Sequence, residues 1–321
     1  MSKDEAVLIC CGLVTLDLTQ VVRALPGPNE KVVAVSQSAT FGGPAANAAA
    51  TAAALGVRTR LVTAVGSGVL ADVVRAEVAA AGVELVEPAS EDRSEPAARP
   101  DGADGPAVST VLVTAGTGER AVVSTNAANR PVALPDGSLL DRTFGLRPKG
   151  RDAGEVLHQG RDVLLLDGHH PALASAVARR AREGGYVVVL DGGSWKDGTA
   201  GLLPLCDAVV LSEDFRVPGE PADRVLDAVA AFGPSFVARS RGARSLELLD
   251  AGVRSTVPVP VVHEVVDTLG AGDVLHGAFA ARIALGEAWT SALEHAAAVA
   301  SWSVTFPGAR GWVGRSGTRR R

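Results

Sequence analysis

Short apolar runs alternate with helical patterns in the second half of this sequence, and this alternation constrains the fold more than any other feature. The apolar runs cover residues 163–166, 186–190, 208–211 and 236–238. The helical patterns between them cover residues 172–183, 200–205 and 221–232. A strand that is apolar throughout is buried on both faces, as in a parallel sheet covered by helices. The sequence therefore predicts an α/β fold, with a doubly wound, mostly parallel sheet and helices on both faces.

Two other segments alternate apolar and polar residues and predict strands with one exposed face. One covers residues 31–38, and the other covers residues 108–125 as two strands joined by the hairpin signal Ala-Gly-Thr-Gly. These strands predict a small sheet outside the main one. Because patterned strands resume on both sides of the loop 91–106, we expect a single domain over residues 1–321.

Composition and charge argue against several classes of protein. Hydrophobic residues make up 47% of the chain and charged residues 21%, which is typical of a globular protein. A net charge of −5 and an aromatic content of 4% argue against a nucleic-acid partner. We find no signal-peptide pattern and no apolar run of the roughly 18 residues that a membrane span needs. Cys10, Cys11 and Cys206 have no disulfide or metal spacing, so we expect a reduced, cytoplasmic protein.

A glycine-rich stretch, Asp-Thr-Leu-Gly-Ala-Gly-Asp, leads from an apolar run into a helical pattern. Gly270, Ala271 and Gly272 leave the backbone unscreened, so their N–H groups can converge where the helix begins and bind an anion. Asp273 would repel a static anion, but it suits a phosphoryl group in transfer, because a carboxylate can accept the proton of the attacking hydroxyl. The alternative is a plain loop turn in which Asp273 caps the helix.

Together with the small residues Gly277 and Ala278 downstream, this motif resembles the signature of the ribokinase-like (PfkB) family of carbohydrate kinases. The resemblance implies ATP-dependent phosphorylation of an alcohol, with Asp273 as the general base and the glycine-turn amides as the anion hole. It also implies Mg²⁺ as a cofactor.

The family's sugar contacts match residues near the N-terminus of this chain. Asp17 lies at a strand end, where open α/β sheets bind ligands, although a turn-capping role is the alternative. Gly42 and Gly43 permit close backbone approach, and Asn47 offers both a donor and an acceptor one helical turn later. Tight packing at a helix start would need the same small residues. Pro44, where some relatives carry Lys, is closer to fructokinase-like and ketohexokinase-like members than to a strict ribokinase.

Asn129 and His169 are two further candidates for the sugar pocket. Asn129 falls where relatives carry an Asn, with turn chemistry as the alternative. His169 occupies the place of a sugar-contacting Glu in many relatives, so it is a candidate for specificity. It is followed by His170, but no third ligand is in view, so we do not expect a metal site there.

The nucleotide site is marked less clearly. Ser240 and Gly242 lie in Ser-Arg-Gly-Ala-Arg-Ser, which loosely resembles the family's Thr-x-Gly-x-x-Gly turn but would also serve a plain hairpin. Lys196 follows an apolar strand and could reach a phosphate, although an exposed lysine is the default. Residues 291–304 predict an alanine-rich helix, and in the family small residues of this helix make room for adenine. The candidates for that role are Ala297, Ala300 and Ser301. The alternative is that the alanines serve tight helix packing alone.

Two carboxylates are candidate metal contacts. Relatives carry Asn-x-x-Glu, linked to Mg²⁺, where this chain has Ser212 and Phe215; Glu213 could substitute through a water molecule. Asp267 matches a residue that helps to bind a monovalent cation such as K⁺ in some relatives. The alternative is that its carboxylate braces the loop.

The sequence thus predicts an ATP-dependent kinase of a small fructose-like or ribose-like carbohydrate, with sugar and ATP as its partners. In the family the small sheet covers the sugar and often forms a dimer surface, so a homodimer is expected. The alternatives are a nucleoside kinase and a catalytically weak sugar or nucleotide sensor on the same fold.

Overall fold

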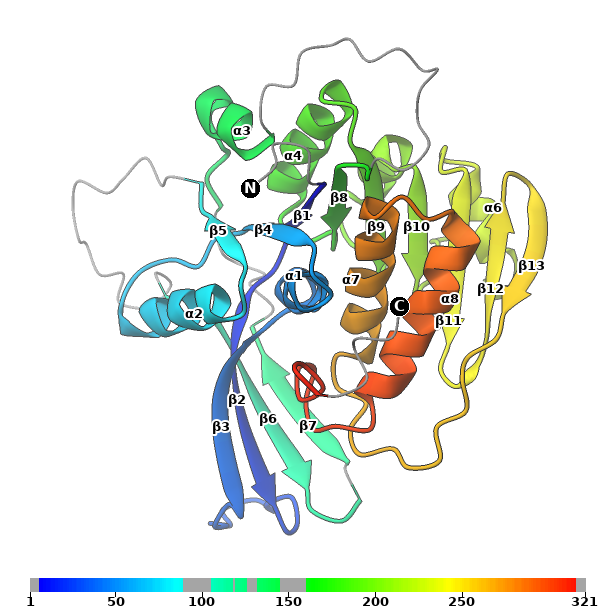
Figure 1. Ribbon diagram of the computed structural model, residues 1–321. Helices are drawn as coiled ribbons and strands as arrows, with labels where there is room; N and C mark the ends of the chain where they lie inside the picture. Colours follow the sequence, from blue (N-terminus) through cyan, green and yellow to red (C-terminus); the bar gives the residue numbers. More distant parts are fainter. Residues whose placement is uncertain (1–5, 89–104, 118, 126–131, 145–159, 316–321) are drawn as a thin grey trace.

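The computed structural model describes residues 6–88, 105–117, 119–125, 132–144 and 160–315 (Figure 1). Its centre is a nine-stranded sheet in the order β13-β12-β11-β10-β9-β8-β1-β4-β5. The parallel strands are β1 (Val7–Cys11), β4 (Arg58–Val62), β5 (Glu84–Val86), β8 (Val163–Leu166), β9 (Val187–Gly192), β10 (Ala208–Leu211) and β11 (Phe236–Arg241). The antiparallel strands β12 (Arg244–Asp250) and β13 (Val253–Val257) complete one edge. The predicted doubly wound, mostly parallel sheet is confirmed.

Helices cover both faces of this sheet, which explains why its central strands are apolar throughout. Successive residues of β1 enter opposite cores: Leu8 and Cys10 belong to one hydrophobic cluster, and Ile9 belongs to the other. On the face of Leu8 lie α1 (Pro44–Ala54), α2 (Val69–Ala80), α7 (Ala271–Ala284) and α8 (Trp289–Ser303). On the face of Ile9 lie α3 (Gly137–Phe144), α4 (Pro171–Glu183), α5 (Thr199–Leu202) and α6 (Val225–Ala230).

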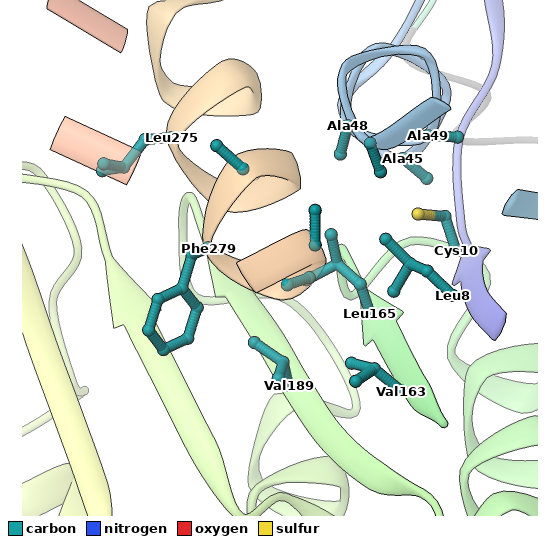
Figure 2. Packing of buried hydrophobic residues seen from close by; sticks show 14 of the residues in the cluster. Leu8, Cys10, Ala45, Ala48, Ala49, Val163, Leu165, Val189, Leu275 and Phe279 are labelled. Atoms are coloured by element: carbon teal, nitrogen blue, oxygen red, sulfur yellow. The ribbon is translucent and has the colours of Figure 1, made fainter. Parts of the chain in front are cut away.

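The close packing of α1 against α7 positions the candidate site. Figure 2 shows Ala45, Ala48 and Ala49 of α1 beside α7, above the apolar side chains of β1 and β8. A Cβ atom on Gly277 would lie 2.4 Å from the carbonyl oxygen of Ala48, so only glycine permits this approach. Asn47 precedes Ala48, and Asp273 lies one helical turn before Gly277, so the contact brings these two polar residues together.

A second, four-stranded sheet in the order β3-β2-β6-β7 projects from the main body (Figure 1). Its strands are β2 (Thr15–Val22), β3 (Ser36–Gly42), β6 (Ala107–Thr114) and β7 (Arg120–Ser124). The strand expected over residues 31–38 instead runs from Ser36 to Gly42. The apolar alternation that suggested 31–38 is solvent-exposed, with Val33 at 84% and Val35 at 59% exposure. The position of β3 is set by its antiparallel pairing with β2 and not by this alternation. The sequence analysis did not predict β2.

None of the described helices combines the length and the apolarity needed to cross a membrane.

Candidate active site

The first turn of α7 is open toward solvent at one corner. Gly270 precedes the helix with φ of 74°, and a Cβ atom there would lie 2.3 Å from the Cβ of Ala309, so the turn requires glycine. At Gly272, apart from its chain neighbours and the backbone of its own helix, no heavy atom of the described residues lies within 4 Å of the position that a Cβ would occupy. The first helical bond is donated by Val274 to the carbonyl of Gly270, at 2.8 Å. The amides of Gly272 and Asp273 come before that bond and are suited to an anion, whereas the amide of Ala271 donates to the Thr268 carbonyl at 3.3 Å.

The carboxylate of Asp273 lies at this corner, close to α1. The Asn47 amide nitrogen donates to Asp273 Oδ2 at 2.7 Å. Burial, followed by the negative charge of Asp191, raises the pKa of Asp273 to about 7. A base whose pKa lies near the working pH combines a usable ionised fraction with a strong pull on the proton of an alcohol. Asp273 and Asn47, both predicted from the sequence, are therefore in direct contact.

Arg310 is a residue of this corner that the sequence analysis missed. Its guanidinium donates to Asn47 Oδ1 at 2.5 Å and to the Phe41 carbonyl at 2.6 Å, and it lies 3.6 Å from the centre of the Phe41 ring. Burial lowers the pKa of Arg310, and the carboxylates of Glu77, Asp17 and Asp273 oppose that shift. An isolated arginine near the C-terminus carries no motif, so no sequence signal distinguished it from an exposed residue.

The sugar-binding candidates of the N-terminal segments converge beside this corner. Asp17 of β2 accepts a hydrogen bond from the Thr15 hydroxyl at 2.7 Å. A Cβ atom on Gly42 would lie 1.9 Å from Asp17 Oδ2, and one on Gly43 would lie 2.5 Å from the Leu13 carbonyl. Both glycines are thus needed for the backbone to approach closely. Gly43, with φ of 94°, then starts the helix that carries Asn47.

Asp167 joins the segments that carry Leu13, Ala45 and His169. Its carboxylate accepts hydrogen bonds from the main-chain N–H groups of Leu13 at 2.8 Å, Ala45 at 3.2 Å and His169 at 2.8 Å. Burial alone would raise the pKa of Asp167, but the His169 ring and these donors hold it at about 2. His169 Nδ1 lies 3.2 Å from Asp167 Oδ1, so this candidate for specificity contacts a structural carboxylate.

Asp191 and His276 form a buried pair beneath Asp273. His276 Nε2 lies 3.0 Å from the Val210 carbonyl, so that nitrogen carries a proton, and Nδ1 lies 3.1 Å from Asp191 Oδ2. Burial, followed by the charge of Asp167, raises the pKa of Asp191 to about 7, and burial lowers the pKa of His276. Sequence reasoning missed both residues, because the pair joins α7 to β9, two elements that are distant in sequence.

The nucleotide candidates are more exposed. Gly242, with φ of 60°, lies in the turn between β11 and β12, which is the plain hairpin weighed as the alternative. Ser240 donates to the Leu211 carbonyl at 3.2 Å, and Lys196 Nζ donates to the Asp167 carbonyl at 3.2 Å. Glu213 forms an ion pair with Arg244 on the surface.

A cavity of about 510 Å³ lies between residues 260–266 and α8. Ser301 lines this cavity together with Trp302, while Ala297 is buried in the core of the protein. Ala300, the third candidate of this helix, packs at the edge of that core. The three adenine candidates therefore face different surroundings.

Asp267 supports the loop before α7. Its Oδ1 accepts the N–H of Leu269 at 2.8 Å, and its Oδ2 accepts the N–H of Gly308 at 2.8 Å. Arg120 of β7 lies 3.3 Å from Oδ1. This geometry fits the bracing role weighed for Asp267. The remaining candidate, Asn129, lies outside the described residues.

Comparison with known proteins decides the family. Residues 6–98 and 105–312 match the pfkB family of carbohydrate kinases. The chain belongs to that family. The resemblance drawn from the Asp267–Asp273 motif is thereby confirmed, and the protein is a carbohydrate kinase of the ribokinase-like type.

Several solved kinase structures share its fold. A ribokinase from Thermotoga maritima is 20% identical, with a TM-score of 0.73 and 96% of each chain covered. An Arabidopsis thaliana ribokinase complexed with ribose and ATP is 20% identical, with a TM-score of 0.69 and coverage of 95% of this chain and 94% of the other. A microbiome-derived acarbose kinase is 19% identical, with a TM-score of 0.75 and coverage of 94% and 93%. At these identities, the likeness supports the fold and not a shared substrate.

Proposed function

We propose that this kinase transfers the γ-phosphoryl group of ATP to a hydroxyl of a small, fructose-like or ribose-like carbohydrate. The observation that carries the proposal is the contact of Asp273 with Asn47 at the open first turn of α7. A base with a pKa of about 7 lies there beside unpaired helix amides, where negative charge develops during phosphoryl transfer.

In the proposed reaction, Asp17 accepts a hydrogen bond from one sugar hydroxyl, and the remaining N–H of Asn47 donates to another. Asp273 takes the proton of the attacking hydroxyl, and that proton remains on its carboxyl group. The amides of Gly272 and Asp273 stabilise the charge on the transferred group. Bound ATP supplies the phosphoryl group and the leaving group. Positioning and fixed dipoles then account for most of the acceleration.

The described residues fit the proposed cofactors unequally. The cavity beside Ser301 and Trp302 has an apolar wall and an open mouth suited to a flat ring such as adenine. Glu213 does not fit a direct Mg²⁺ ligand, because Arg244 already neutralises its carboxylate. Both carboxylate oxygens of Asp267 accept main-chain N–H groups. Each oxygen keeps a second lone pair, so these hydrogen bonds are compatible with a K⁺ ion beside the loop. We keep Mg²⁺ as the companion of ATP, held by phosphates and water.

We also propose that two copies pair through the second sheet. Apolar side chains on one face of this sheet are exposed to solvent, with Leu18 at 39% and Val123 at 75%. Both residues pair with Thr110, so they share that face. Sedimentation of the wild-type protein beside a V123K variant tests this proposal, which predicts a dimer that the substitution weakens.

A coupled assay of ADP production over a panel of free sugars and nucleosides tests the activity. We expect turnover with one or a few ketoses or pentoses, and none with nucleosides. Turnover with a nucleoside alone would instead identify a nucleoside kinase. ATP binding without ADP production over the whole panel would overturn the proposal in favour of a sensor.

A further inference from the structure

We infer that Arg310 is a positioning residue of the acceptor site, which fixes the Asn47 amide so that its nitrogen holds the Asp273 carboxylate. The inference deepens the proposed function, because it concerns the same base. It rests on a chain of contacts that joins three elements distant in sequence: the segment after α8, the first turn of α1 and the first turn of α7.

The segment after α8, red in Figure 1, brings Arg310 between the main body and the second sheet. Arg310 donates through Nη1 to Asn47 Oδ1 and through Nη2 to the carbonyl of Phe41, the penultimate residue of β3. The Phe41 N–H in turn donates to Glu77 of α2 at 3.2 Å. The guanidinium is therefore held by the end of β3 on one side and by Asn47 on the other.

The orientation of the Asn47 amide follows from the chemistry of its two neighbours. A guanidinium only donates hydrogen bonds, and an ionised carboxylate only accepts them. The amide oxygen must therefore face Arg310 and the amide nitrogen must face Asp273, as the 2.5 Å and 2.7 Å contacts show. The reversed amide would place donor against donor and acceptor against acceptor, at a site where charged partners make each contact roughly twice as strong as a neutral one.

Three carboxylates offset the cost of burying the charged guanidinium. Glu77, Asp17 and Asp273 all favour the charged form of Arg310, and they lie on α2, β2 and α7. The plane of the guanidinium also covers the Phe41 ring at 3.6 Å. A lysine would supply the charge but not two fixed donors and a stacking face.

For the reaction, these contacts fix the orientation of the Asp273 carboxylate and of the Asn47 amide. With its oxygen bonded to Arg310, Asn47 offers the substrate N–H donors only. With Oδ2 bonded to Asn47, Asp273 presents Oδ1 to the attacking hydroxyl. Without Arg310, the amide is free to turn and the carboxylate loses the contact that sets its rotation. A displacement of a reacting group by about 1 Å can lower the reaction rate roughly a hundredfold.

Steady-state kinetics of R310K and R310A form the first test, with R254K as a matched control. Arg254 lies on the edge strand β13 and makes an exposed ion pair with Asp227 of α6. We expect kcat to fall roughly tenfold to a hundredfold in both Arg310 variants, with the KM for ATP nearly unchanged. Millimolar guanidinium should partly restore R310A and leave the other proteins unchanged. An R310K enzyme with wild-type kcat, or no rescue of R310A, would overturn the inference.

Side-chain amide NMR of Asn47 forms the second test and needs no sugar. In the wild-type protein, we expect these signals to follow the titration of Asp273, which is itself surrounded by Asp191, His276 and Asp167. In D273N the part of that pH response that comes from Asp273 should be lost, leaving only a smaller shift from the titration of Asp191, and in R310K the signals should shift. If the Asn47 signals of the wild-type protein do not change as Asp273 titrates, the inference is wrong. This outcome can be read even if an Arg310 variant fails to fold. If no substrate in the panel gave ADP, the proposed function would be overturned. The NMR test would still decide the role of Arg310, because it does not depend on turnover.

Discussion

The corner around Asp273 and the turn around Gly242 belong to one proposed reaction but are built differently. At the corner, Asp273, Asn47 and Arg310 come from three elements and hold one another through partly buried hydrogen bonds. At the turn, Glu213 and Arg244 meet on the surface, with side-chain exposures of 46% and 58%. Buried polar networks are strong and costly to break, whereas exposed ion pairs contribute little. The contrast indicates that the side chains are held more firmly where a proton must move than where we expect the nucleotide.

Asp273→Asn tests the corner most severely and has the largest expected effect. The amide cannot accept a proton from an alcohol, so we expect turnover to fall by roughly 10²–10⁴-fold with little change in ATP affinity. Single-turnover kinetics and calorimetric titration with ATP measure the two quantities. Unchanged turnover would show that Asp273 is not the general base. The corner would then have no catalytic role to set against the exposed turn.

The pH dependence of kcat/KM should show the raised pKa of Asp273. The carboxyl must be ionised to act as a base, so activity should fall about tenfold per pH unit below pH 7 and level off above it. At pH 5 the loss should approach about a hundredfold. In D191N the falling limb should move to lower pH, because the neighbouring negative charge no longer opposes the ionisation of Asp273. ATP binding over the same pH range is the control, and an unmoved limb in D191N contradicts this cause.

Gly277→Ala tests whether the approach of α1 to α7 sets the geometry of the corner. The added methyl group would lie 2.4 Å from the Ala48 carbonyl, so the two helices must separate. We expect a stability loss of about 1–3 kcal/mol by thermal unfolding, and a several-fold fall in kcat as Asn47 moves away from Asp273. Gly201→Ala is the matched control, since apart from its chain neighbours and its own helix backbone no described heavy atom lies within 4 Å of its Cβ position. A stable variant with unchanged kcat would show that the corner tolerates helix movement.

Local patterns predicted much of the main sheet. The strands at 163–166 and 208–211 are continuous apolar runs, and they appear at the same residues as β8 and β10. By contrast, β2 and β3 contain Asp17, Gln20 and Ser36 and are held by pairing within the second sheet, so local composition gave little signal for them.

The candidate site was predicted best at residues that stand beside informative glycines. Asp273 and Asn47 stand beside glycines whose spacing is itself informative, and the structure places them in contact. Arg310 and the Asp191–His276 pair act through partners more than 60 residues away along the chain, as the separation of 263 residues between Arg310 and Asn47 illustrates. Such partnerships depend on how the helices cross, and one sequence does not encode that in any local pattern.

Glu213→Gln tests the exposed region and has the smallest expected effect. The pair with Arg244 is exposed and screened by water, so its loss should cost less than about 1 kcal/mol of stability. If the carboxylate only pairs with Arg244, kcat should change less than twofold, and the Mg²⁺ concentration at half-maximal activity should stay the same. If Glu213 organises Mg²⁺ through water, that concentration should rise severalfold, and the control R244Q, which frees the carboxylate, should lower it. A higher Mg²⁺ requirement in E213Q would show that the exposed turn takes part in the reaction. The turn and the corner would then both contribute to catalysis.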